Sequence, residues 1–427
     1  MPHQRHKLFR VRDIHDHSPV TYIELFFDLV FVFAITQLSH RFIEHLTYRG
    51  AAETVLLLLA VWWVWIYTSW TTNWLDPDRA HVRLMLLLLM AGGLVLSAAI
   101  PDAFGESGLA FAGAYCAMQL YRTLYMAWAA RGVHRGRMRN FLRIAFWFLL
   151  SLPLWIYGAF CEADLRFALW AAALMVEYAG PFAFFRTPGL GRSSGEDWDI
   201  SGAHMAERCA LFIIIALGEA VLMTGATFGD TPQTQGYWFA FLSSFAGSAT
   251  MWWIYFDVGA KRGSERISTS DNAGLMARNA YTYLHIPIVA GVVVTAVGDE
   301  MLIMHPTGHM SSAAIWAMVG GPALFLLGNQ GFKWVTSGMR FPPLSHFFGL
   351  LLLTAIGFAA AHWHWQPIAA PGLPAGRSPQ SGRPAIASLA RFPSAPFARA
   401  DPGHGCHGFL RGSCSGGCRA STARPEN

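Results

Sequence analysis

Two acidic residues stand four positions apart in an otherwise apolar stretch near the N-terminus. Glu24 and Asp28 belong to the run Glu-Leu-Phe-Phe-Asp-Leu-Val-Phe-Val-Phe. Residues at this spacing share one face of a helix, where two like charges repel each other unless a cation, a proton or an arginine lies between them. The pair therefore predicts a cation or proton site. The alternative is a structural pair that is neutralised by an arginine from a neighbouring helix.

A second polar group opens a later apolar stretch. His204, Glu207 and Arg208 lie at positions i, i+3 and i+4, so they again share a helix face. If the two helix ends meet, Arg208 can neutralise Glu24 or Asp28. His204 and Glu207 could instead bind a metal ion with those carboxylates. No second histidine has a matching spacing, however, so we predict no metal site and no cofactor.

Three more ionisable residues lie within or at the end of apolar segments. Glu219 stands twelve positions beyond Glu207, which is ~18 Å farther along a helix. Asp257 ends another segment, and His285 precedes Pro287, which removes a backbone N–H and should weaken the helix near that point. Ionisable groups at membrane depth are costly and usually serve a function or pair with one another. We therefore place these residues on one predicted ion pathway with the two clusters, or else among hydrogen-bonded structural groups.

The composition indicates where these residues lie. Of the 427 residues, 54% are hydrophobic and 13% are charged, and the charged share is about half that of a soluble protein. A bilayer-spanning helix needs ~20 mostly apolar residues. The sequence therefore predicts an all-α, polytopic transmembrane helix bundle embedded in the lipid bilayer. Its eleven spans are expected near 22–40, 53–72, 83–101, 109–130, 141–160, 166–185, 205–226, 236–256, 279–298, 312–334 and 344–363.

Lysine and arginine in the connections predict the orientation. Sixteen occupy the N-terminal tail and the even-numbered connections, whereas the odd-numbered connections hold only Arg41, Arg49 and Arg166. Positive residues concentrate on the cytoplasmic side, so we expect a cytoplasmic N-terminus. Residues 1–365 contain 24 basic and 24 acidic residues, so the net charge of +5 arises in the remaining tail. That distribution gives no support to nucleic-acid binding.

The two halves of the chain share landmarks in the same order. The Trp-Trp-Val-Trp run from Trp62 recurs as Trp-Trp-Ile-Tyr from Trp252, and the apolar run before Asp102 recurs before Asp299. We interpret this as a parallel duplication of a six-helix unit, and therefore as a twelve-helix pattern.

The twelfth helix of this pattern has no matching segment. Near 366–385 the chain is rich in Pro and Gly and cannot span hydrocarbon, so its end is either divergent or read out of frame. The expected organisation is a cytoplasmic tail (1–20), a first repeat (21–186), a cytoplasmic linker (187–203), a second repeat with five clear spans (204–365) and a disordered Pro/Gly/Arg-rich tail (366–427).

Taken together, these motifs resemble the bacterial low temperature requirement protein A (LtrA) family. The resemblance covers residues 18–363 in order and rests on Glu24-Leu-Phe-Phe-Asp28, His204-x-x-Glu207-Arg208, Leu217-Gly218-Glu219, Trp252-Trp253-x-Tyr255-x-Asp257 and Tyr283-x-His285-x-Pro287. It implies a multi-pass protein of the bacterial inner (plasma) membrane. The family name refers to a growth requirement in the cold and implies no molecular activity. The tail after residue 365 departs from the family pattern.

The balance of deep charges favours one class of function. Six acidic residues and three basic residues lie at membrane depth, so the interior favours a monovalent cation or a proton over an anion. We expect cation- or proton-linked transport or permeation. The alternatives are a non-transporting scaffold or sensor in the envelope or in cold adaptation, and a membrane enzyme acting on lipid. No paired Asp-rich or His/Asp motif supports the enzyme. A homo-oligomer is left open.

Overall fold

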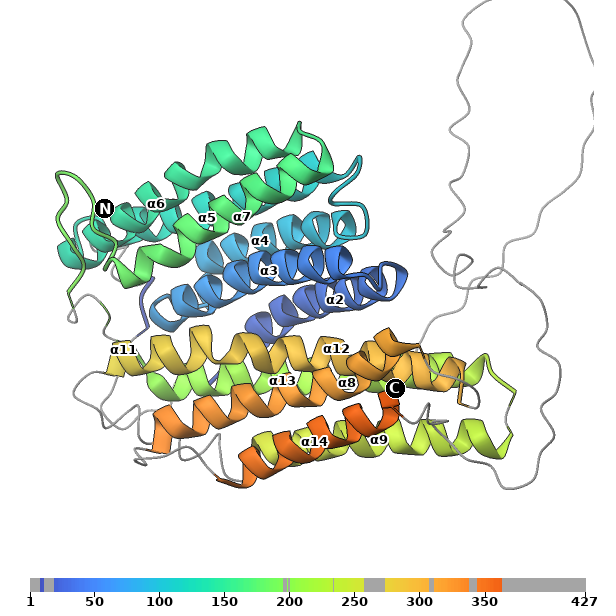
Figure 1. Ribbon diagram of the computed structural model, residues 1–427. Helices are drawn as coiled ribbons and strands as arrows, with labels where there is room; N and C mark the ends of the chain where they lie inside the picture. The colour runs from blue at the N-terminus through green and yellow to red at the C-terminus, as the bar shows by residue number, and fades with distance from the viewer. Residues whose placement is uncertain are drawn as a thin grey trace, which may run out of the picture. The chain divides into compact units, whose positions relative to one another are not determined.

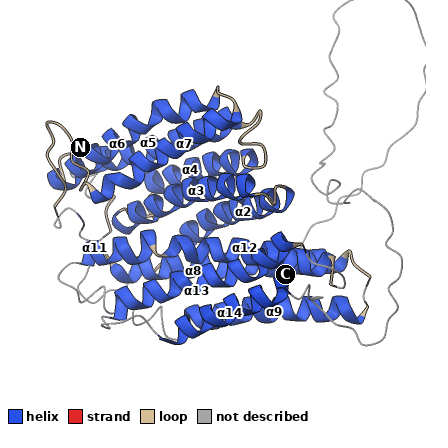
Figure 2. Cartoon of the chain, viewed as in Figure 1, coloured by secondary structure: helices blue, strands red, loops and turns tan. Residues whose placement is uncertain are grey.

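Every segment expected to cross the membrane contains a helix. The computed structural model describes residues 8–10, 19–194, 198, 200–232, 234–256, 273–306, 311–337 and 344–362. Figure 2 shows only helices, loops and turns over this part of the chain. The helices are α2 (Tyr22–Glu44), α3 (Tyr48–Trp74), α4 (Ala80–Ala99), α5 (Gly108–Ala130), α6 (Arg135–Ala159), α7 (Ala163–Phe182), α8 (Gly202–Gly229), α9 (Gln235–Phe256), α11 (Ala273–Ala277), the π-helix η2 (Arg278–Tyr283), α12 (His285–Met304), α13 (Ser312–Ser337) and α14 (Leu344–His362).

The predicted all-α bundle is therefore confirmed, and its apolar helices fit a membrane protein. Within the described residues, seven stretches are long and apolar enough to cross a bilayer: α2, α3, α4, α6, α8, the run Gly274–Met304 and α13. Helix α14 has a shorter apolar part, Leu344–Ala360. The other three, α5, α7 and α9, fall short of that apolarity, in part because α5 carries Arg122 and α7 carries Glu177. Membrane crossing by these four helices stays a prediction.

The helices lie side by side, and the two halves of the chain occupy two sides of the bundle (Figure 1). Helices α2 and α3 of the first half pack against α8 and α12 of the second. In the first half, the packed pairs include α2–α3, α2–α4, α3–α5, α4–α5 and α5–α6, and α7 packs against α6 and α3. The second half contains the corresponding pairs α8–α9, α8–α12, α9–α13, α12–α13 and α13–α14.

The connections sort to two opposite ends of the bundle, as an up-and-down topology requires. At one end, Arg41 of α2 donates to the carbonyl of Pro101 at 2.5 Å, and Arg166 of α7 donates to that of Ala103 at 2.9 Å. At the other end, Arg10 donates to the carbonyl of Thr72 at 2.9 Å, and Arg278 donates to that of Pro181 at 2.7 Å. The first, third and fifth connections thus meet at the first end, and Arg10 lies at the second.

Aromatic side chains make α3 the most buried helix of the first half. Trp62, Trp63 and Trp65 are at most 2% exposed, because they face neighbouring helices on several sides. The residues that match them in sequence behave differently: Trp252 and Trp253 on α9 are 46% and 63% exposed. The sequence match between these tryptophans therefore does not extend to their surroundings.

Glycines let α12 and α13 approach each other closely. A Cβ atom added at Gly291 would lie 2.5 Å from the backbone nitrogen of Phe325, and one added at Gly321 would lie 2.5 Å from that of Thr295. Small residues at such crossings allow close backbone packing inside a membrane. Ahead of this contact, the helix that Pro287 interrupts takes a π-helical turn, in which Leu284 N donates to Asn279 O at 3.1 Å.

Candidate functional site

Three polar contacts join α2 and α8 and show that the two helices run parallel. His204 meets Glu24, Arg208 meets Asp28, and Glu219 meets Thr36. The partners are 180, 180 and 183 positions apart in the chain, so both helices advance together from one contact to the next. The contacts extend over about 18 Å, the rise of twelve helical residues between Glu24 and Thr36. We call this set of residues the α2–α8 polar interface.

The first contact lies at the end of the bundle that holds the N-terminal residues. Glu24 caps its own helix, since its Oε2 accepts from the backbone N–H and the hydroxyl of Thr21, each at 2.9 Å. Arg10 Nη2 donates to the same oxygen at 2.9 Å, and His204 Nε2 lies 3.0 Å from Oε1. The side chain of Glu24 is fully buried. Its four polar contacts offset the cost of burying a carboxylate.

His204 has a partner on each side of its ring. Its Nδ1 lies 3.3 Å from Nδ2 of Asn73, which can donate only, so Nδ1 accepts. Nε2 then carries the proton and donates to Glu24, while Nη2 of Arg10, which bonds the other oxygen of Glu24, lies 3.2 Å from the same nitrogen. Asn73 in turn holds the start of α8, because its Nδ2 donates to Ser201 O and its Oδ1 accepts from Ser201 N, each at 2.9 Å. The neutral ring is therefore fixed between α2, α3 and α8.

The second contact is an ion pair with no exposure to solvent. Arg208 Nη2 donates to Asp28 Oδ1 at 2.8 Å, and Trp65 Nε1 donates to the same oxygen at 2.7 Å. Arg208 also reaches Ser69 Oγ at 3.3 Å and lies over the ring of Trp65 at 5.6 Å. Within the described residues, Asp28 Oδ2 and Arg208 Nε and Nη1 have no partner. Arg208 neutralises Asp28 as predicted, but each member keeps unused hydrogen-bonding capacity.

The third contact lies deeper in the bundle. Thr36 Oγ1 is 2.6 Å from Glu219 Oε1 and 3.1 Å from the carbonyl of Val32. A hydroxyl can donate only one hydrogen bond. When Glu219 is ionised, Thr36 donates to it, and Val32 O receives no hydrogen bond from Thr36. A protonated Glu219 can instead donate to Thr36, which then donates to Val32. The pair therefore accommodates Glu219 with or without a proton.

Two other predicted residues, Glu207 and His285, lie apart from this interface. Glu207 is exposed, and its Oε2 accepts from Val20 N at 3.3 Å. His285 is fully buried in the second half, where its Nδ1 faces Ala280 O at 2.9 Å and its Nε2 faces the hydroxyl of Tyr255 at 2.8 Å. Asp257 lies outside the described residues, as does the tail 366–427. The described residues contain no group of three or more His, Cys, Asp or Glu that could hold a metal ion.

A separate polar network lies inside the first half. Glu177 on α7 accepts from the hydroxyl of Tyr115, from Ser151 Oγ at 2.6 Å and from Trp155 Nε1 at 2.8 Å. Arg122 on α5 is fully buried and donates to Val64 O at 3.1 Å. Glu177 thus satisfies three donors from α5 and α6, which is what a structural carboxylate between packed helices requires.

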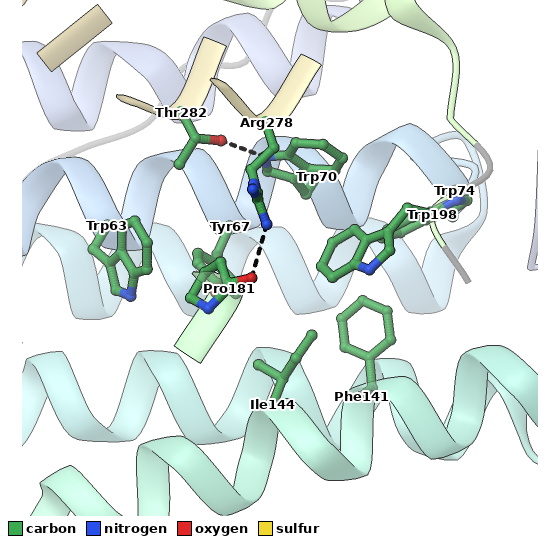
Figure 3. Close-up of a pocket in the computed structure, with 10 residues that line it drawn as sticks. All are labelled: Trp63, Tyr67, Trp70, Trp74, Phe141, Ile144, Pro181, Trp198, Arg278 and Thr282. Carbon is green, nitrogen blue, oxygen red and sulfur yellow. Dashed lines mark hydrogen bonds between the residues drawn. The ribbon is translucent and has the colours of Figure 1, made fainter. Parts of the chain in front are cut away.

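A small aromatic pocket lies beside the π-helical turn (Figure 3). Its cavity of about 20 Å³ is roomy enough for one water molecule and too small for an organic substrate. Arg278 and Thr282 from η2 lie on one side, where Trp70 Nε1 donates to Thr282 Oγ1 at 3.1 Å. The remaining walls are Trp63, Tyr67, Trp70, Trp74, Phe141, Ile144, Pro181 and Trp198.

The sequence did not predict that several residues outside α2 and α8 would contact the α2–α8 polar interface. Arg10 belongs to the polar N-terminal segment, whose sequence has no periodicity that predicts a contact 14 positions away with Glu24. Trp65 and Asn73 lie on α3, which the charge pattern of α2 and α8 does not involve. The only available signal was that polar Asn73, like the tryptophans, interrupts an apolar segment.

The family model described as bacterial low temperature requirement A protein (LtrA) matches residues 19–374, so the match ends a little beyond residue 365. "Uncharacterized protein RA0937" of Rhizobium meliloti (strain 1021) is 42% identical over 340 residues, which cover 80% of this chain and 83% of that protein. No solved structure matches the chain. The protein therefore belongs to the LtrA family of bacterial proteins.

Proposed function

We propose that this membrane protein moves a proton or a monovalent cation across the bacterial inner membrane along the α2–α8 polar interface. The observation that carries the proposal is the ion pair of Asp28 and Arg208, which is fully buried yet leaves atoms of both partners without a hydrogen bond to any residue that the structure describes. Unmet polar groups are costly at membrane depth and mark ion pathways in many membrane proteins. A water molecule, a proton or a cation would satisfy Asp28 Oδ2.

Glu219 and Thr36 supply the next step of the proposed path. They lie deeper along the same two helices, and their hydrogen bonds suit both the protonated and the ionised carboxyl group. At the opposite end, the neutral ring of His204 is hydrogen-bonded to Glu24. Groups that can exchange protons are thus spaced along one helix pair. Arg208 neutralises the charge of Asp28 when no transported cation is bound.

The sequence supports the orientation. Arg10 contacts the end of α3 and Arg278 contacts the end of α7, and in the sequence these residues lie on the Arg-rich side of the chain, so the positive-inside rule places that end of the bundle in the cytoplasm. The corresponding helix pairs in the two halves, and the parallel course of α2 and α8, support a duplicated six-helix unit with both copies in the same orientation. Glu24 and Asp28 then form the cytoplasmic entrance.

A flux assay tests the proposal. The full chain is reconstituted in liposomes, and H⁺, Na⁺ and K⁺ movement is recorded under an imposed potential. We expect Glu219→Gln to abolish the flux. Glu106→Gln is the matched control, since Glu106 is an exposed carboxylate in the loop between α4 and α5. Undiminished flux in Glu219→Gln removes Glu219 from the path, and no flux from well-folded wild-type protein contradicts the proposed transport.

One observation favours a second candidate, a non-transporting scaffold or sensor. Both oxygens of Glu24 are bonded, by donors from the N-terminal segment, from its own cap and from α8. Such a saturated group fixes three parts of the chain to one another. A scaffold predicts that neutral substitutions in the α2–α8 polar interface change folding or partner binding and leave every measured flux unchanged.

A further inference from the structure

An open cavity of about 590 Å³ lies in the connection that follows α7, and two arginines line it. Arg186 and Arg192 are exposed there, and neither side chain forms a hydrogen bond or an ion pair with a residue that the structure describes. The other described residues of its wall are Ala183, Phe184 and Gly191, none of which is acidic. Two guanidinium groups therefore share one space without a described counter-charge.

The backbone between these two arginines is held in a fixed turn. Thr187 and Gly191 exchange two backbone hydrogen bonds, at 2.8 and 3.0 Å. Arg143 of α6 donates Nε and Nη2 to the carbonyl of Leu190, at 3.0 and 2.9 Å. The two cavity arginines are the next residues outward from this bridge, so they stand opposite each other. Like charges in opposite positions repel unless an anion lies between them.

An aromatic ring is held beside the arginines by an unusual backbone. Phe184 and Phe185 have φ angles of 49° and 47°, in the left-handed region that residues other than glycine seldom adopt. Phe185 is 2% exposed, whereas Phe184 is 47% exposed and lines the cavity. Arg278 lies over the Phe184 ring at 6.0 Å. Backbone strain of this kind is frequent at ligand-binding sites, where it is part of the preorganised geometry.

We propose that Arg186 and Arg192 bind the phosphate of an anionic phospholipid of the surrounding bilayer. A guanidinium group presents paired N–H donors that match the oxygens of a phosphate, and two such groups on a fixed turn can hold one phosphate between them. The bound anion would remove the repulsion between the arginines. This site does not depend on transport along the α2–α8 polar interface.

The surroundings of the cavity favour a lipid over a free phosphate ion. Helix α7 ends at Phe182, which is 61% exposed and, with Phe184, offers apolar surface beside the arginines. Arg278 Nη1 donates to the carbonyl of Pro181 at 2.7 Å (Figure 3), so the cavity lies at the end of the bundle that the positive-inside rule places in the cytoplasm. Basic pockets at the cytoplasmic ends of membrane helices bind anionic lipid headgroups.

Thermal unfolding of the full chain in detergent tests the site. The protein is titrated with dioleoyl phosphatidylglycerol, or with dioleoyl phosphatidylcholine, which has the same acyl chains and no net charge. We expect a saturable rise of Tm with phosphatidylglycerol alone, because a ligand that binds only the folded state stabilises it. Arg186→Gln and Arg192→Gln should each weaken the apparent affinity about tenfold, the loss expected for one contact between charged groups.

Phe184→Gly should also weaken the affinity, because it removes the ring while glycine adopts a φ of 49° without strain. Arg139→Gln is the matched control, since Arg139 is an exposed arginine on α6 that does not line the cavity. It loses the same charge and should leave the affinity unchanged.

Three results overturn the proposal. The first is an equal rise of Tm with the two lipids. The second is an affinity loss in Arg139→Gln as large as in the cavity variants, which would mean that only the total charge matters. The third is an equal rise with sodium phosphate at the same concentration, which would assign the cavity to a free phosphate ion. If one cavity variant does not fold, the other decides the matter by the same comparison.

Discussion

Arg208 donates to Asp28 one helical turn beyond the contact between His204 and Glu24, and in both pairs the partners are 180 positions apart. This equal separation means that α2 and α8 keep one register while they pass a histidine–carboxylate pair and then an arginine–carboxylate pair. Neither pair belongs to one helix alone. The charge of Asp28 is therefore balanced only when the second half of the chain has packed against the first, whereas Glu24 is also paired with Arg10.

The first prediction concerns the cost of separating these charges. Asp28→Asn or Arg208→Gln alone should lower the free energy of unfolding by about 3–5 kcal/mol, because each leaves a buried charge without its partner. The double variant should cost less than the sum of the two. Chemical denaturation of the four proteins in detergent gives this coupling as a double-mutant cycle. Additive losses would mean that the pair contributes no mutual stabilisation.

The second prediction uses two adjacent glycines on α13. A Cβ atom at Gly321 would lie 2.4 Å from Thr295 Oγ1, whereas one at Gly320 would meet nothing within 4 Å. Gly321→Val should therefore lower Tm sharply, with a loss of about 1–3 kcal/mol for overpacking, while Gly320→Val should lower it only slightly. Because the two variants have the same change in helix propensity, similar Tm losses would show that the close α12–α13 approach does not limit stability.

The third prediction concerns the loops at the end opposite Arg10. Arg166 is 7% exposed and donates to the carbonyls of Ala103, Gly105, Ala159 and Cys161 at 2.9, 2.7, 3.0 and 3.1 Å. It thus joins the α4–α5 and α6–α7 connections. Arg166→Gln should lower the free energy of unfolding by about 2–4 kcal/mol, since several carbonyls lose a charged donor.

Limited proteolysis is the second measurement for Arg166, because the freed loops should become accessible at temperatures where the helices stay folded. The control is Arg139→Gln, at an exposed arginine on α6. If both variants are cleaved at the wild-type rate, the carbonyl contacts do not hold the loops.

The helices could be predicted from the sequence because each apolar segment meets the length that a bilayer demands. A pairing of Arg208 with Glu24 or Asp28 could also be predicted, since repelling carboxylates need a cation and an equivalent helix offered one, but the choice of Asp28 came from the structure. The exposed position of Glu207 was harder to predict. Glu207 and Arg208 are neighbours in the sequence, so their side chains point about 100° apart around the helix. A spacing of i, i+3 and i+4 therefore does not show which of them faces α2. Trp62 is buried whereas Trp252 is exposed, although their local sequences match. This difference depends on which helices surround α3 and α9, and the local sequence does not contain that information.

The fourth prediction connects the deepest contact of the α2–α8 polar interface to flux. Thr36→Val replaces a hydroxyl by a methyl group of similar size and removes the 2.6 Å contact with Glu219, whereas Thr36→Ser keeps the hydroxyl. If Glu219 gains and loses a proton during transport, the valine variant should slow the flux about tenfold or more, the equivalent of one hydrogen bond to a charged group.

The serine variant should transport at nearly the wild-type rate in the same liposomes, which separates the loss of the hydroxyl from a general disturbance of packing. Equal Tm values for the three proteins would show that the variants fold alike. Undiminished flux in Thr36→Val would mean that the hydroxyl of Thr36 takes no part in the proton exchange. A loss of flux in both variants would assign the effect to the shape of the side chain, because the hydroxyl that bonds Glu219 survives in one of them.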